Sequence, residues 1–597
     1  MDFEFGELTD HIGERNQAKF LFNYLKGQSA ACFIVETGYV DRNYSSDYHK
    51  YFSLSSGLHY DFCKRLTFFS TRIDEALLQT LQDPENVDIR NEISGKLLGT
   101  IVVRPLPQAR IGKTLLRWYH DDQTKINPRI MCRSYRHSFS IGTLNLSIEG
   151  IPWQQQDMEV SVCSTVAVWS QLYASANSVH YRTPTVAEIT EAAIKNYSTG
   201  HRIFPAKGWE SGHIGEAIKS SGLEPMDTGD GVALWLSDSQ LCALLSDEAG
   251  SNVNLSAIDG HDETFNNLGK HALHMLSGKK LNKFLTPFLH LGVPVVLAGN
   301  YIVNKDELSQ SDGSENLSQH AICVTGYRQS TDLSEYTGNH SIIPNSHHAS
   351  TYYVHDDNIG PNSRFRFFSK SASLEIKNNG EDDIFTAEYC FLKREPPDGR
   401  EGAIEEEAQD VIFMPYRAFV AVEKSHRLCP MEVQKIFSDQ AIGAMTPFVD
   451  KLLRRHGLQY ATANGTFCTD FRFYNSSEYM KTQVPTPNNY AYKGQLLLDV
   501  AGMMGSMSKT IGVTRLYAVK KHQTSVRVFP FFDIVHDTTT AHPTQSVSTF
   551  LIYTTNIEAE KGFVEILKNA FEADEINLPK RYIGLSSVEG SHIRDIS

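Results

Sequence analysis

The sequence predicts an α+β protein of several domains, and three observations support this fold class. The chain has 597 residues, enough for about three or four domains of ordinary size. Hydrophobic residues make up 41% of the chain, the usual share for a globular protein that buries large cores. Short strand patterns recur between stretches that have the spacing of amphipathic helices.

Residues 1–148 are expected to form a mixed α/β domain of unknown role. Within this domain, residues 16–27 have the pattern of a helix, and residues 30–40 have the pattern of a strand. A second strand is expected over residues 95–107, where two prolines close it with a turn. This segment could serve the next domain as a platform.

A candidate nucleophile lies in the next stretch, residues 151–172. A glutamine-rich turn leads to Cys163, and apolar residues then recur with helical spacing, so Cys163 is expected at or near a helix N-terminus. The exposed N–H groups and the positive end of the helix dipole stabilise a thiolate there, which is the nucleophilic form of cysteine. Gln156, or its neighbour Gln155, is close enough upstream to offer a side-chain N–H to a developing oxyanion.

The catalytic interpretation of Cys163 requires further groups, because a lone cysteine at the start of a buried helix is more often a small hydrophobic residue. His320 begins an alternating apolar strand, so its ring can project from the end of a sheet toward Cys163. A later strand ends in Asp356 and Asp357, and either carboxylate can hold the imidazole in the tautomer that takes a proton from Cys163. The sequence leaves the choice between them open.

Two further elements are expected between the cysteine and the histidine. A capping box at Thr185 and Glu188 predicts the start of a helix. Residues 268–292 have the pattern of one long amphipathic helix, which is expected to end at Gly292 and to lead into a buried strand over residues 293–299.

Four segments, in this order, resemble the papain-like cysteine peptidases, especially the bacterial branch that includes double-glycine leader peptidases of the bacteriocin-processing type. They are the glutamine turn with Cys163 and the strands GVPVVLAG, SQHAICVTGY and YVHDDNIGP. The resemblance covers about 240 residues and implies a papain-like domain over residues 149–395. In such a domain, a helix bearing the cysteine packs on an antiparallel sheet bearing the histidine and the aspartate, here flanked by two further α/β-mixed domains.

The resemblance also implies a role for each matching residue. The roles are nucleophile for Cys163, base and then acid for His320, orienting acid for Asp356 with Asp357 as the alternative, and oxyanion donor for Gln156 with Gln155 as the alternative. Three departures stand against the family pattern. Ser164 follows the nucleophile where glycine or alanine is usual, Asp357 stands where a proline-led dipeptide is usual, and the loop between the histidine and the aspartate is long.

The remaining chain begins with a composition change. Residues 396–410 are charged and contain Pro and Gly, as expected of a linker. Residues 411–597 are expected to form an α+β domain of unknown role, with a strand over residues 414–422 and a long helix that begins at Pro430 and ends at Gly457.

Composition restricts the partners and the compartment. The net charge of -14 argues against a protein built to bind nucleic acid or an anionic membrane. Nine cysteines without CxxC pairing, together with an acidic N-terminus that is not a secretory signal, predict a cytoplasmic protein with reduced thiols. The histidines at 340, 347 and 348 lack the spacing of a metal site, so neither a metal nor another cofactor is predicted.

The first functional hypothesis is an intracellular thiol hydrolase, a cysteine peptidase that cleaves a peptide or protein amide through a thioester. The large flanking domains also fit contact with a regulatory protein partner. The alternative is a catalytically inactive papain-like scaffold that binds partners, because the same fold can persist without turnover.

Overall fold

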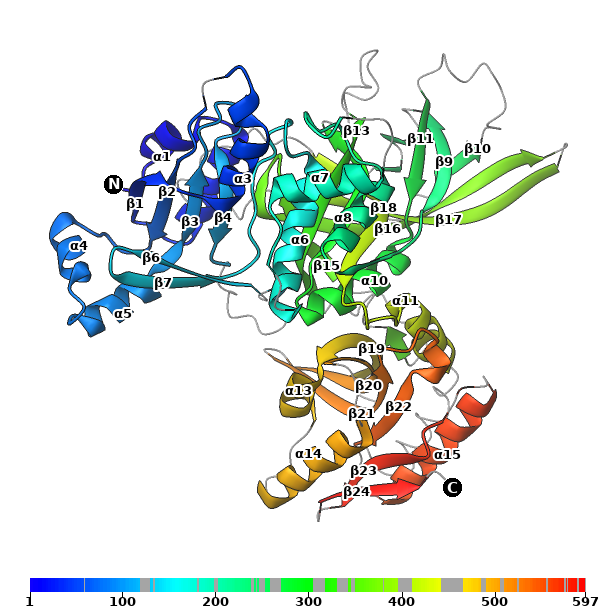
Figure 1. The fold of residues 1–597 in the computed structure, drawn as a ribbon. Coiled ribbons are helices and arrows are strands. Elements are labelled where there is room, and N and C mark those ends of the chain that lie inside the picture. Colours follow the sequence, from blue (N-terminus) through cyan, green and yellow to red (C-terminus); the bar gives the residue numbers. More distant parts are fainter. Residues whose placement is uncertain are drawn as a thin grey trace.

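The computed structural model shows a mixed α+β protein with several antiparallel sheets (Figure 1), so the expected α+β class is confirmed. The structure describes residues 1–57, 59–118, 129–132, 135–179, 182–197, 202–237, 241–242, 244–245, 253–257, 270–303, 317–329, 342–344, 349–378, 381–395, 411–441, 465–484, 490–504, 509–522, 525–553, 557–573, 576, 578–587 and 590–595. The expected linker and the histidines at 340, 347 and 348 lie outside the described residues.

The first segment contains a four-stranded antiparallel sheet with its strands in chain order. These strands are β1 (Cys32–Tyr39), β2 (Cys63–Phe69), β3 (Leu97–Val103) and β4 (Ile111–Leu116). The helices are α1 (Phe5–Ile12), α2 (Asn16–Gly27), α3 (Arg42–Lys50), α4 (Glu75–Gln82) and α5 (Val87–Gly95), followed later by the hairpin β6 (Arg136–Ile141) and β7 (Leu144–Glu149). The expected helix over residues 16–27 and both expected strands are present.

A closed barrel of six strands forms the centre of the molecule. Its strands are β12 (Val295–Val303), β13 (Leu317–Gln329), β15 (Ala349–Asp356), β16 (Gly360–Asn378), β17 (Glu381–Arg394) and β18 (Val411–Val422). Each pairs antiparallel with its neighbours, and the pairing of β16 with β17 closes the ring. Near their turn, β16 and β17 extend well beyond the barrel (Figure 1).

The barrel sheet draws strands from all three segments that the sequence distinguishes. Strand β18, expected in the last domain, pairs with β12. The short strand β5 (Arg129–Met131), which precedes the catalytic segment, pairs with β13. Shorter strands join at the margins: β8 (Glu224–Asp227) pairs with β18, and β10 (Val253–Ala257) with β16.

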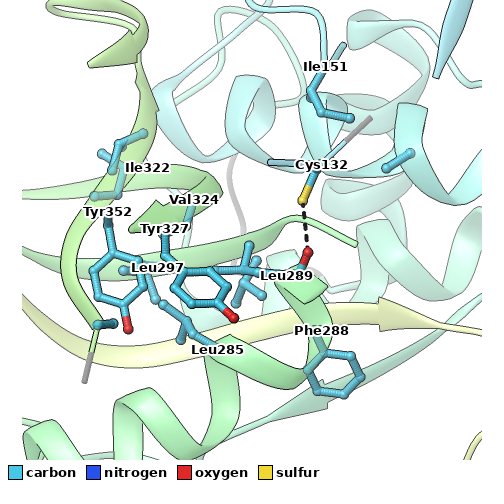
Figure 2. Close-up of a cluster of buried hydrophobic side chains, with 14 of the residues drawn as sticks. Cys132, Ile151, Leu285, Phe288, Leu289, Leu297, Ile322, Val324, Tyr327 and Tyr352 are labelled. Carbon is cyan, nitrogen blue, oxygen red and sulfur yellow. Dashed lines mark hydrogen bonds between the residues drawn. The ribbon is translucent and has the colours of Figure 1, made fainter. Parts of the chain in front are cut away.

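Helix α10 (Gly278–Leu291) packs against most of the barrel strands. Figure 2 shows Leu285 and Leu289 of α10 beside apolar side chains of β12 and β13, among them Leu297, Val324 and Tyr327. All of these side chains are fully or almost fully buried. The helix and the barrel strands therefore share one hydrophobic core, which fixes the register of β13 and with it the position of His320.

The expectation of one helix over residues 268–292 is wrong for residues 270–277. There the chain forms β11 (Lys270–Met275), which pairs antiparallel with β9 (Val232–Ser237), and α10 begins only at residue 278. The reason lies in the local pattern. Leu273 and Met275 are buried while His274 between them is exposed, a period of two that suits a strand. The helix ends as predicted, with Gly292 in the left-handed conformation.

Helices α6 (Cys163–Val179), α7 (Val186–Asn196) and α8 (Ser211–Ser220) form a group beside the barrel (Figure 1). Val168, Trp169 and Leu172 of α6 share a buried cluster with Val296 of β12 and Cys323 of β13. Helix α7 begins with the predicted capping box. The apolar face of α6 therefore sets where its first residue lies.

The C-terminal part contains a seven-stranded sheet. Its strands are, in order, β14 (Ile342–Pro344), β19 (Gly465–Asn475), β20 (Thr510–His522), β21 (Ser525–Asp537), β22 (Val547–Ile552), β23 (Arg581–Ser587) and β24 (Gly590–Asp595). The edge strand β14 comes from the chain between β13 and β15. The main helices are α14 (Tyr490–Met504) and α15 (Ile557–Ala573), the latter between the parallel strands β22 and β23.

The helix expected to begin at Pro430 does begin there, as α11 (Pro430–Val433), and continues as a π-helix over Gln434–Ala441. Its expected end at Gly457 lies outside the described residues. Across the described part of the chain, none of the helices combines the length and the apolar character needed to cross a bilayer.

Two buried histidines make stability dependent on pH. Burial lowers the pKa of His536 to about 3 and that of His426 to about 4. His536 lies between the hydroxyl groups of Thr514 and Ser546, each 2.9 Å from a ring nitrogen. Below a pH of about 6.5 the unfolded chain binds a proton at each of these positions while the folded chain does not, so stability falls as the pH decreases.

We predict that His536→Gln weakens this acid destabilisation. One such histidine contributes up to about 1.4 kcal/mol per pH unit between its folded and unfolded pKa values, so the loss of stability from pH 7 to pH 5 should shrink by about 2 kcal/mol. Calorimetric unfolding of the full chain at both pH values measures this difference. An unchanged difference would mean that the His536 ring is protonated in the folded protein.

Candidate functional site

Cys163 is the first residue of α6, as the sequence predicts. Its side chain is half-buried and packs against the cluster that joins α6 to the barrel. The first N–H groups of a helix have no partner within the helix, so they are available to a ligand or an oxyanion near Cys163. Val162 precedes the helix, and its backbone N–H donates a hydrogen bond to the hydroxyl oxygen of Thr165.

The loop before Cys163 is shaped by one buried carboxylate. Oδ1 of Asp157 accepts hydrogen bonds from the backbone N–H groups of Glu159, Val160 and Ser161, at 2.7 to 3.0 Å. Oδ2 of Asp157 accepts from the Ser161 hydroxyl and lies 3.3 Å from the Arg104 guanidinium. Both charged side chains are almost fully buried. Because Arg104 follows β3, this ion pair connects the loop before α6 to the N-terminal segment of the chain.

Arg104 ties this loop to the first sheet through three more hydrogen bonds. Its guanidinium donates to the backbone oxygens of Ala109 and Ile111, and to that of Gln155 at 2.7 Å. A buried guanidinium that bonds one carboxylate and three backbone oxygens is a rigid support. The sequence signalled neither Arg104 nor Asp157, since they lie 53 residues apart.

Trp153 connects the same segment to the end of β15. Its backbone pairs with Thr114 of β4, and its indole N–H donates to the carbonyl oxygen of Asp356 at 3.0 Å. Next to it, the Ser170 hydroxyl of α6 donates to the carbonyl oxygen of Pro152. The glutamine segment therefore contacts β4, α6 and the carboxylate end of β15.

The glutamines occupy different environments. The side-chain oxygen of Gln155 accepts from the backbone N–H of Ile111 at 3.4 Å, so this carboxamide faces β4. Gln156 is half-buried. Gln154, which the sequence did not single out, is buried, and its side-chain nitrogen has no hydrogen-bond partner among the described residues.

His320 lies on β13, directly opposite Gly299 of β12. A side chain at Gly299 would meet the backbone oxygen of Met414 and the ring of Phe413 at about 2.5 Å, so glycine permits this close approach of β18. The ring of Tyr301 packs against the imidazole, with 4.6 Å between the ring centroids. Tyr301 was not predicted, because nothing distinguishes it within an apolar strand.

Both candidate acids lie beside the same nitrogen of His320. Nε2 is 3.2 Å from Oδ1 of Asp356 and 3.4 Å from Oδ1 of Asp357. All three side chains are buried. Asp356 ends β15, which pairs with β13, and its Oδ1 also accepts from the backbone N–H of Asn358. The two alternatives that the sequence left open are therefore both in contact with the histidine.

The charges around His320 favour its protonated form. Burial by itself lowers the pKa of His320, but the negative charges of Asp357, Cys163 and Asp356 together raise that pKa well above its ordinary value of 6.5. Burial raises the pKa of Asp357 to about 7; the charge of His320 opposes this increase and the charge of Asp356 adds to it. Burial and the two carboxylates also raise the pKa of Tyr301.

Cys163 is thus close enough to His320 for a thiolate charge to act on the imidazole. The carboxylates engage Nε2, which leaves Nδ1 as the ring nitrogen that can exchange a proton with the thiol. A thiol at a helix start, an imidazole and a carboxylate in this arrangement can perform nucleophilic acyl transfer. Comparison of the chain with protein-family models, curated proteins and solved structures found no match.

The first segment also contacts the turn that carries Asp357. The Gln17 side chain of α2 donates to the backbone oxygen of Asp357 at 3.1 Å. Gly360, which ends this turn, has a φ of 155°, and a β-carbon on it would lie 2.2 Å from the ring of Phe20. The carboxylate turn is therefore packed directly on α2.

We predict that Asp157→Asn destabilises the chain and loosens the loop before Cys163. Removing one partner of a buried ion pair leaves the other uncompensated, at a cost of about 3–5 kcal/mol. The matched control is Arg72→Ala, which breaks the exposed pair with Asp2 and should change stability by less than about 1 kcal/mol. Calorimetric unfolding measures both, and equal small effects would contradict a supporting role for Asp157.

Proposed function

We propose that the chain is a thiol hydrolase, and specifically a cysteine peptidase with Cys163, His320 and Asp356 as its catalytic groups. The observation that carries this proposal is the position of His320. Its Nε2 is hydrogen-bonded to a buried carboxylate, and the negative charges of Asp357, of Cys163 at the start of a helix and of Asp356 raise its pKa. These are the relations that nucleophilic catalysis by cysteine requires.

The architecture supports a papain-like assignment for the domain around the site. A helix that begins with the candidate nucleophile packs against antiparallel strands, and neighbouring strands carry the histidine and the aspartate. The orienting role goes to Asp356, because it makes the shorter contact with Nε2 and also belongs to the paired strand.

Acylation would begin with the proton of the Cys163 thiol on Nδ1 of His320. The thiolate attacks the carbonyl carbon of the amide, and the developing oxyanion is stabilised by the backbone N–H of Cys163 and by the side-chain N–H of Gln156. The C–N bond breaks as His320 returns its proton to the leaving amine. The acyl group is then held as a thioester on Cys163.

Deacylation would use the same imidazole as a base. His320 removes a proton from water, the hydroxide oxygen attacks the thioester carbon, and the C–S bond breaks. The carboxylic acid leaves, and the proton returns to the sulfur of Cys163. Throughout, Asp356 accepts the Nε2–H hydrogen bond and keeps the imidazole in one tautomer. A peptide or protein amide is the favoured substrate, because expelling an amine requires the protonation that His320 supplies.

We predict that Cys163 reacts with iodoacetamide at neutral pH faster than the other eight cysteines of the chain. His320→Ala should slow this reaction at least about tenfold, since the imidazole charge that favours the thiolate is lost. Mass spectrometry of labelled peptides over time measures the rate at each cysteine.

The control for this labelling is His536→Gln, which removes a buried histidine remote in sequence from the site. It should leave the Cys163 rate unchanged. If Cys163 reacts no faster than the other cysteines in the wild-type chain, the peptidase proposal fails, and a partner-binding papain-like scaffold without turnover becomes the better explanation.

We also predict unequal effects of the two carboxylates on hydrolysis. Asp356→Ala should lower kcat/KM at least about tenfold, because it removes the hydrogen bond that orients Nε2. Asp357→Ala should have a smaller effect, since its contact with Nε2 is longer. Hydrolysis of a fluorogenic peptide library by the full chain measures both. A larger loss in the Asp357 variant would transfer the orienting role to that residue.

A further inference from the structure

The cluster of His320, Asp356 and Asp357 has a second property beyond orienting an imidazole. Each residue offers one ligand atom, and these three atoms all lie within 4.8 Å of one another. Imidazole nitrogen and carboxylate oxygen are ordinary ligands of divalent transition metals. All three residues are buried, unlike the acidic groups that gather on protein surfaces without binding ions.

The second observation concerns unused hydrogen-bonding capacity. Oδ2 of Asp356 and Oδ2 of Asp357 are both buried, and neither has a hydrogen-bond partner among the described residues. Asp356 is fully buried and Asp357 is 3% exposed. An unpaired buried carboxylate oxygen is costly, and a bound cation would remove that cost. Because Oδ1 of each carboxylate lies beside Nε2 of His320, a cation that takes both oxygens of a carboxylate would also engage its unpartnered Oδ2.

The spacing fits a small tetrahedral ion. Ligand atoms at about 2.0–2.2 Å from a tetrahedral Zn²⁺ lie about 3.3–3.6 Å from one another. Nε2 of His320 is 3.2 Å from Oδ1 of Asp356 and 3.4 Å from Oδ1 of Asp357. Both distances from Nε2 therefore match the spacing of adjacent ligands on such an ion. Two carboxylates would also balance the charge of a divalent cation.

We propose that His320, Asp356 and Asp357 bind one divalent transition-metal ion of the Zn²⁺ type, with water as the fourth ligand. Binding replaces the proton on Nε2, which leaves to solvent. Cys163 is not part of this ligand set, which consists of His320, Asp356 and Asp357 alone. Three protein ligands with one open position are the arrangement of zinc sites that hold a water molecule or a substrate.

The consequence for catalysis rests on the proposed function. A neutral imidazole that ligates a metal through Nε2 carries its single proton on Nδ1. The metal takes the place of the Nε2 proton whose hydrogen bond to Asp356 orients the ring, so the metal-bound form lacks that positioning contact. Bound metal should thereby change the rate of hydrolysis, and removing the ion should reverse that change.

The test is a titration of the metal-free full chain with Zn²⁺ against a chromophoric chelator. The wild-type chain should bind one ion with micromolar or tighter affinity, and Asp357→Asn should weaken that binding at least about tenfold. Cys163→Ser should bind as the wild type does. With Co²⁺ as the probe, the absorption spectrum should lack a thiolate-to-metal charge-transfer band.

Two controls keep the result specific. The double variant His347→Gln with His348→Gln removes two histidines that precede β15 in the sequence and should leave the affinity unchanged. Calorimetric unfolding without metal verifies that Asp357→Asn is folded. Wild-type affinity in Asp357→Asn, or a charge-transfer band that disappears in Cys163→Ser, would overturn the proposed ligand set.

The outcomes separate this inference from the peptidase proposal. Specific Zn²⁺ binding by a chain whose Cys163 shows no enhanced labelling would retain the metal site and reject the peptidase. Enhanced labelling that is insensitive to saturating Zn²⁺ and to chelators, with no bound ion, would retain the peptidase and reject the metal site.

Discussion

The contact between Nε2 of His320 and the carboxylates at the end of β15 is the constraint on which the site depends. A buried imidazole must satisfy its N–H, and buried carboxylates must meet a donor or a charge. The pairing of β13 with β15 brings these groups together, and Trp153 fixes the same turn through the backbone oxygen of Asp356. Because the carboxylates hold Nε2, the orientation of the ring is fixed, and Nδ1 is the ring nitrogen left for the thiol.

The thiol side of the site is held by a different part of the chain. Asp157 folds the loop before α6, and Arg104 joins that loop to the first sheet. Gln17 of α2 contacts the turn that carries Asp357. The first segment is thus more than the platform that its sequence predicts, because it contacts both the loop before Cys163 and the turn that carries Asp357. Relative movement between this segment and the barrel would change the distance on which the coupling of Cys163 and His320 depends.

Much of this arrangement could be predicted from local patterns. The helix start at Cys163, the capping box at Thr185 and the strand that carries His320 each depend on short-range spacing, which the sequence displays directly. Long-range pairs were not predictable. Arg104 with Asp157 and Tyr301 with His320 join elements whose proximity only the closed barrel determines. Strand β11 was missed because its short alternation adjoins a true helix, and the two patterns merge when they are considered as one run.

The closure of the barrel by β18 affects how the chain can be divided. A fragment that ends before residue 411 would keep the candidate nucleophile, base and acid but would lack the strand that pairs with β12 along most of its length. The backbone groups of β12 would then form an open sheet edge, the kind of surface on which chains associate with one another. If such a fragment were inactive or aggregated, the missing strand would explain the result. The result would say nothing about the chemistry of the intact protein.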